Sequence, residues 1–275
     1  MIPPLDKVTV SNLAAFFVCR LVLGKRIALL PQLAKVRGLM LLYIASPFFT
    51  ALLNSDPVVS GPLFIVGMNY YDALSAVIRQ LLFILPFLLG LQFFRSQKAL
   101  EEILMVLALA GFWYSLPMLF EMRVSPQLHV WIYGYFPHSF LQQMRGEGFR
   151  PVVFIGHGLW VAFFAMTALV SSVALWRIKL SPVRQVSRGM LVAYLSVLLV
   201  LCKSMASLVY GVFLFLLIKF FKPRLQLRIA MLIVLLALSY PLIRGIGWFP
   251  INQLSGLAAT VSEERAESFD FRMRN

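Results

Sequence analysis

The side chains best suited to chemistry in this sequence are its three histidines and a set of basic residues. The histidines are His129, His138 and His157, and the basic residues are Arg123, Arg145, Arg150, Lys203, Arg244, Arg265, Arg272 and Arg274. A guanidinium donates two parallel hydrogen bonds, which suits a phosphate group, and a neutral imidazole accepts a proton near neutral pH. These residue types predict a site that binds a phosphorylated ligand and transfers a proton.

Two of the arginines are spaced for joint binding. Arg265 and Arg272 are seven residues apart, so a helix over 262–274 would carry both on one face, about 10 Å apart. Such a pair would clamp a diphosphate. The alternative is that the cations serve as charge partners of anionic lipid headgroups or of nearby acids. Those acids are Glu121, Glu147, Glu263, Glu264, Glu267 and Asp270.

Three further residues each allow a functional and a plain interpretation. His157 lies between Gly156 and Gly158, where a ligand can come close and give up a hydroxyl proton, but it also suits a hydrogen-bonded interface histidine. Lys203 would meet a phosphate or an acceptor sugar, or would anchor the chain at the membrane interface. Arg79 lies inside an apolar run, where a charge is costly, so it is either functional or extends to the interface.

The chain around these residues is too apolar for a soluble domain. Of its 275 residues 60% are hydrophobic and 13% are charged, and the mean hydropathy is +0.84. Soluble domains carry about 25% charged residues, so too few polar groups are present to cover a water-exposed globule. The composition therefore predicts an all-α protein that crosses a membrane several times.

Apolar runs close to the length that spans a bilayer, about 20 residues, recur along the chain. We expect about eight transmembrane helices, at 8–24, 38–53, 73–94, 99–120, 151–176, 189–202, 204–221 and 229–247. Fourteen of the 25 Lys and Arg residues fall in four alternate loops, which the positive-inside rule places in the cytoplasm. The outer side then receives 54–72, 121–150, Lys203 and 248–275.

The apolar run 189–221 requires a break. As a single helix its 33 residues would be about 50 Å long, whereas the hydrocarbon core is about 30 Å thick. One helix would also move the basic cluster Lys222, Arg224 and Arg228 to the outer side, against the positive-inside rule. We therefore predict a tight helical hairpin with Lys203 at its outer tip.

Several classes of site have no sequence support. Cys19 and Cys202 lie in apolar runs, and the sequence has no Walker A loop, His-Glu-x-x-His pair or Asp-x-Asp motif. The net charge of +14 is spread between apolar runs, so it does not indicate nucleic-acid binding. We expect no metal and no cofactor. We also expect 1–275 to be one membrane domain of a longer protein, because both ends lie in outer segments.

Three stretches, taken in order, resemble the bacterial superfamily of O-antigen ligases and O-antigen or exopolysaccharide polymerases. They are Arg150–Gly158, Leu201–Ser207 and Ser262–Arg272. The resemblance implies metal-independent glycosyl transfer on the outer face of the bacterial inner membrane, with an undecaprenyl-diphosphate-linked glycan as donor. By position Arg265 and Arg272 would hold the donor phosphates, with Arg150 a weaker match. The surroundings of Arg150 are more similar to exopolysaccharide polymerases than to ligases.

Two other classes of function stay open beside this enzyme. A transporter of polysaccharide or lipid-linked glycan would use outer cations to steer its cargo, but it should carry polar residues through the full membrane depth. The central parts of the apolar runs are nearly pure Leu, Phe, Val and Ala, which favours the enzyme. The third class is a structural partner of other polysaccharide-assembly proteins in the membrane.

Overall fold

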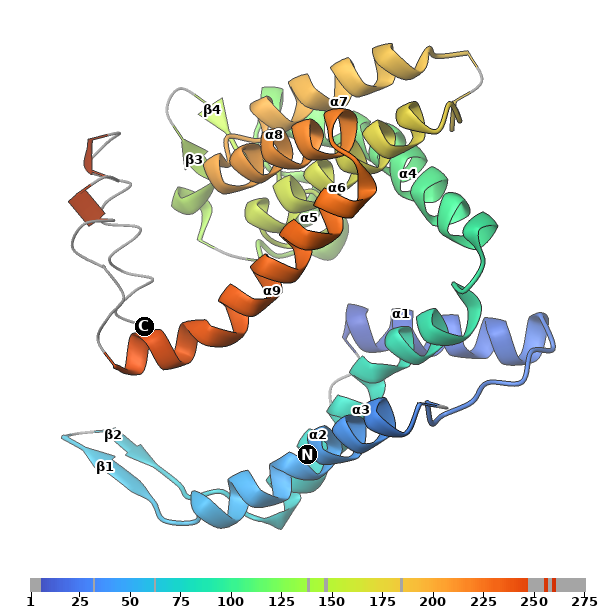
Figure 1. The fold of residues 1–275 in the computed structure, drawn as a ribbon. Helices are drawn as coiled ribbons and strands as arrows, with labels where there is room; N and C mark the ends of the chain where they lie inside the picture. Colours follow the sequence, from blue (N-terminus) through green and yellow to red (C-terminus); the bar gives the residue numbers. More distant parts are fainter. Residues whose placement is uncertain are drawn as a thin grey trace. The chain divides into compact units, whose positions relative to one another are not determined.

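The computed structural model describes residues 6–31, 33–61, 63–137, 139–145, 148–183, 185–246, 255–256 and 259–260. The described part of the chain is mostly helical. It divides into two compact units, Met1–Leu104 and Met105–Asn275, and each is described by itself (Figure 1).

The first unit is built from helices and one hairpin. Its elements are α1 (Lys7–Phe17), the π-helical turn η1 (Val18–Val22), α2 (Ala34–Leu53), β1 (Val58–Ser60), β2 (Leu63–Ile65), α3 (Tyr70–Phe93) and the start of α4 (Gln97–Val124). Helix α3 packs against both α1 and α2. It begins at a capping box, in which the Asn69 side chain accepts the backbone N–H of Asp72 and the Asp72 carboxylate accepts that of Asn69.

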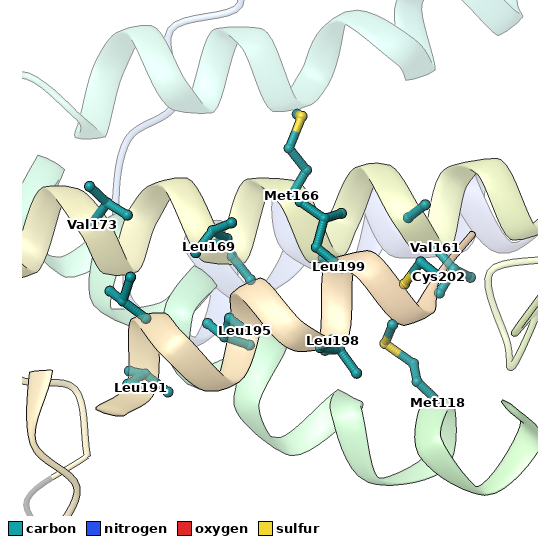
Figure 2. Close-up of a cluster of buried hydrophobic side chains, with 14 of the residues drawn as sticks. Met118, Val161, Met166, Leu169, Val173, Leu191, Leu195, Leu198, Leu199 and Cys202 are labelled. Carbon is teal, nitrogen blue, oxygen red and sulfur yellow. The ribbon is translucent and has the colours of Figure 1, made fainter. Parts of the chain in front are cut away.

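The second unit centres on α6. Its elements after α4 are α5 (Leu128–Tyr133), the 3-10 turn η2 (Phe140–Gln143), β3 (Met144–Arg145), β4 (Gly148–Phe149), α6 (Gly158–Arg177), α7 (Arg188–Leu201), α8 (Met205–Phe220) and α9 (Pro223–Gly245). Both α7 and α8 pack against α6. Buried side chains of α6 and α7 form an apolar core with Met118 of α4, and partly buried side chains of α8 pack against it (Figure 2). Helices α4 and α6 come into close contact at Gly111 of α4. A Cβ at this position would lie 2.2 Å from the Cβ of Ala168 of α6, so only glycine fits there.

Within the described ranges, five helices are long and apolar enough to cross a membrane, and they indicate a multi-pass membrane protein. They are α2, α3, α4, α6 and α9. Helix α9 buries none of its residues against the rest of the chain, as a lipid-facing helix would. The other three predicted spans hold shorter apolar helices, Val8–Val22, Arg188–Leu201 and Met205–Phe220. At 1.5 Å per residue, α7 and α8 are about 21 and 24 Å long, less than a bilayer core of about 30 Å.

The predicted break in the run 189–221 is present. Helix α7 ends at Leu201 and α8 begins at Met205, with Lys203 between them in the left-handed backbone region at φ 52°. Which side of a membrane this tip faces stays a prediction from the distribution of basic residues.

The predicted helix 151–176 begins later than expected, at Gly158. Residues 151–157 form an irregular segment because Val153 (φ 47°) and Gly156 (φ 92°) have left-handed backbone conformations. The described residues also include two short antiparallel hairpins, which the all-α prediction did not contain. The first, with Val58 opposite Ile65, lies in the predicted outer segment 54–72, and the second pairs Arg145 with Gly148.

Candidate functional site

The irregular segment 151–157 is held in place by one acidic side chain, Glu121, near the end of α4. The carboxylate is fully buried, and its Oε2 accepts the backbone N–H groups of Val152 at 2.8 Å and Val153 at 2.7 Å. Its Oε1 accepts the N–H of Leu128 at 3.0 Å, which also fixes the first turn of α5. Glu121 is therefore a partner of backbone amides, and not the charge partner of an outer arginine that the sequence suggested.

A second side chain of α4 holds the same segment. Tyr114 lies seven residues before Glu121, on the same helical face, and its hydroxyl accepts the backbone N–H of Phe154 at 3.0 Å. Three consecutive backbone amides, from Val152 to Phe154, are thereby satisfied by α4. This arrangement explains why the segment is ordered without being helical, because its amides have partners outside their own backbone.

Arg150 precedes this segment and connects it to the tip between α7 and α8. The side chain is buried, with 8% of its surface exposed, and its Nη2 donates to the carbonyl oxygen of Lys203 at 2.8 Å. The backbone N–H of Arg150 donates to the carbonyl of Gln143 at 2.8 Å. The guanidinium thus binds a backbone carbonyl group that is 53 residues away in sequence. A hydrogen bond of this kind sets the position of the tip.

A buried amide lies beside Arg150. Gln143 is fully buried, and within the described ranges neither its Oε1 nor its Nε2 has a hydrogen-bond partner. A Cβ added to Gly158 would lie 2.5 Å from the Cδ of Arg150 and 2.6 Å from the Oε1 of Gln143, so only glycine fits at the start of α6. An unsatisfied buried amide costs about 1–3 kcal/mol. A water molecule or a bound polar group would supply the missing partner.

His157 caps the amino end of α6. The side chain is half-buried, and its Nδ1 accepts the backbone N–H of Leu159 at 3.0 Å. In a neutral imidazole an accepting Nδ1 leaves the hydrogen on Nε2. Nδ1 is then the nitrogen that could accept a proton from a sugar hydroxyl. Such a transfer would first have to break the hydrogen bond between Nδ1 and the N–H of Leu159.

Lys203 extends toward the β3–β4 hairpin. Its Nζ lies 2.7 Å from the position that a Cβ of Gly148 would occupy. Gly148 in turn pairs with Arg145, so the sequence candidates Arg145, Arg150, His157 and Lys203 belong to elements that meet at one end of the second unit. The contacts of the Arg145 side chain lie outside the described part of the structure.

The remaining candidates are placed elsewhere or not described. Arg79 belongs to the first unit, where its guanidinium carbon lies 5.5 Å from the centre of the Phe83 ring. The pKa of the Asp6 carboxyl is lowered, mainly by the backbone N–H of Thr9 and to a smaller extent by the positive charge of Arg79. The Phe83 ring is therefore the described contact of the Arg79 guanidinium, and its charge also acts on Asp6. Arg265, Arg272 and His138 lie outside the described residues.

Three residues of the site had no functional prediction from sequence. Tyr114, Glu121 and Gln143 are an aromatic, an acid and an amide whose importance follows from burial and partners. The available signal was the seven-residue spacing of Tyr114 and Glu121 at the end of an apolar run. Gln143 has no comparable signal in its neighbourhood of polar residues.

The described residues contain no group of three or more His, Cys, Asp and Glu side chains that could hold a metal ion. Comparison of the whole chain with protein-family models, with curated proteins and with solved structures finds no match.

Proposed function

We propose that this protein is a membrane glycosyltransferase that polymerises or transfers an undecaprenyl-diphosphate-linked glycan on the periplasmic face of a bacterial inner membrane. The observation that carries the proposal is the hydrogen bond from Arg150 Nη2 to the Lys203 carbonyl at 2.8 Å. It joins two of the three stretches on which the family resemblance rests, although they are 53 residues apart. The third stretch, which includes Arg265 and Arg272, lies outside the described residues.

The proposed reaction depends on stabilising the negative charge of the departing diphosphate. Transfer of the glycan releases a polyprenyl diphosphate, and cations already directed at that group stabilise the charge that develops on it. Arg265 and Arg272 would hold the diphosphate, while Arg150 acts as a positioning residue for the tip that carries Lys203. The unpaired amide of Gln143 beside Arg150 leaves a donor and an acceptor that a polar group of the substrate or a water molecule would satisfy.

The transporter alternative receives less support. A transporter that moves a polar glycan across the bilayer needs a polar path through the helices. In the second unit the space between α4, α6 and α7 is filled by apolar side chains, among them Met118, Leu169 and Leu195 (Figure 2). Its described polar groups are a few hydroxyls, such as Ser115 against Tyr194 of α7 and Ser172 of α6, while Arg150, Gln143 and His157 lie near the start of α6.

The test is a turnover assay with the full chain in lipid nanodiscs and a purified undecaprenyl-diphosphate oligosaccharide as donor. Mass spectrometry of the released glycan measures product length. We expect Arg265→Lys and Arg272→Lys each to reduce product formation at least tenfold, or about 1.4 kcal/mol of transition-state stabilisation, because lysine cannot make a bidentate phosphate contact. Arg224→Lys is the matched control, since Arg224 is an exposed arginine in the first turn of α9 and is not among the candidate site residues.

The same assay tests the metal dependence. We expect product formation to continue in excess chelator. No product from the unmodified chain, loss of activity in chelator that one divalent ion restores, or normal product from both lysine variants would each contradict the proposal.

A further inference from the structure

The first unit contains an apolar groove between α2 and α3. Its volume is about 540 Å³, within the range of small-molecule sites, and its walls include Val36, Met40 and Tyr43 of α2 and Phe83 and Phe87 of α3. These residues come from the first half of α2 and the second half of α3. The groove therefore lies toward the ends of the two helices that are opposite to the β1–β2 hairpin.

Exposed basic residues gather at that same end of the unit. They are Lys25, Arg26, Lys35, Arg37, Arg95 and Lys98. Lys35 is next to the groove residue Val36 and shares its helical face with Leu39, which also lines the groove. The acids nearby are Glu101 and Glu102 of α4, and the sequence from 7 to 55 contains no acidic residue. The end of the groove therefore carries a clear positive excess.

Hydrogen bonds hold the Lys25–Arg26 loop at this end. The Gln92 side chain of α3 donates through Nε2 to the carbonyl of Arg26, and its Oε1 accepts the N–H of Ala28 at 2.9 Å. Gln92 is five residues beyond the groove residue Phe87, or about 7.5 Å along the helix axis. The cations of the loop are consequently close to the groove, and not only close in sequence.

We propose that this groove binds an anionic phospholipid, with an acyl chain between α2 and α3 and the headgroup at Lys35, Arg37 and Arg26. A small inorganic anion would leave the apolar walls without a partner, and a zwitterionic lipid would leave the cations uncompensated. Basic pockets between transmembrane helices bind anionic headgroups for this reason. The basic loops at this end are those that the positive-inside rule assigns to the cytoplasm, so the lipid belongs to the cytoplasmic leaflet.

Native mass spectrometry of the detergent-purified full chain, titrated with phosphatidylglycerol or phosphatidylcholine, tests this site. We expect phosphatidylglycerol to be retained at least fivefold better than phosphatidylcholine. The double variant Lys35→Gln/Arg37→Gln should lose that preference. Its matched control is Lys222→Gln/Arg224→Gln, which removes two exposed cations with the same spacing at the start of α9 and should keep the preference.

A second variant addresses the groove itself. Met40→Trp fills the groove and should reduce retention of both lipids, whereas Leu42→Trp, at a 66% exposed position of the same helix, should not. Equal retention of the two lipids by the unmodified chain would overturn the proposal. Unchanged preference in the Lys35/Arg37 variant, or equal loss in the Lys222/Arg224 control, would overturn it as well. If Met40→Trp fails to fold, the charge variants decide the question, because they alter exposed side chains alone.

Discussion

Replacing Glu121 with glutamine tests whether one carboxylate holds the segment before α6. The native side chain accepts three backbone N–H groups, two at Oε2 and one at Oε1. Glutamine has a single acceptor oxygen, which can at best keep the two donors of Val152 and Val153. Its amide group would then face the N–H of Leu128, donor against donor.

The expected magnitude follows from the number of donors left unpaired. Each unsatisfied buried donor costs about 1–3 kcal/mol, so Glu121→Gln should lower the free energy of unfolding by about that amount. Glu121→Ala leaves all three donors unpaired, and the same rule predicts a loss of about 3–9 kcal/mol. This is comparable with the whole stability of a typical domain, about 5–15 kcal/mol, so we expect little folded protein from the alanine variant.

The assay is denaturant unfolding of the purified chain in detergent, followed by the loss of helical signal. Glu102→Gln is the matched control, because Glu102 is exposed on the same helix and the same atoms are changed. The control should stay within about 0.5 kcal/mol of the unmodified chain, as surface substitutions usually do. A Glu121→Gln variant as stable as this control would refute the role assigned to the carboxylate.

Two further predictions concern packing and topology. Gly111→Ala should cost about 1–3 kcal/mol or more, measured by the same unfolding assay, because its Cβ would lie 2.2 Å from that of Ala168; Gly90→Ala, whose Cβ meets no atom closer than 3.7 Å, should be tolerated. In a cysteine-free background, Lys203→Cys should react with a membrane-impermeant thiol reagent from the outer side and Lys179→Cys from the cytoplasmic side. Reaction of Lys203→Cys from the cytoplasmic side alone would contradict the predicted hairpin orientation.

The multi-pass character and the helix break at Lys203 were predictable because both depend on local composition. A run of apolar residues has to leave water whatever surrounds it, and a 33-residue run is too long for one crossing of a bilayer core of about 30 Å. The same reasoning overestimated the helix at 151–176. Residues 151–157 are apolar enough for a span, but their hydrogen-bond partners come from α4.

Only part of the membership of the candidate site was predictable from sequence, and the roles of its residues were not. Residue type and position singled out Arg150, His157 and Lys203, which meet at one end of the second unit. The contacts that define their roles connect distant parts of the chain, such as Arg150 with the Lys203 carbonyl and Glu121 with Val153, 32 residues away. A donor or acceptor bonds to whichever group lies within about 3 Å in the folded chain, and packing of the helices determines which group that is.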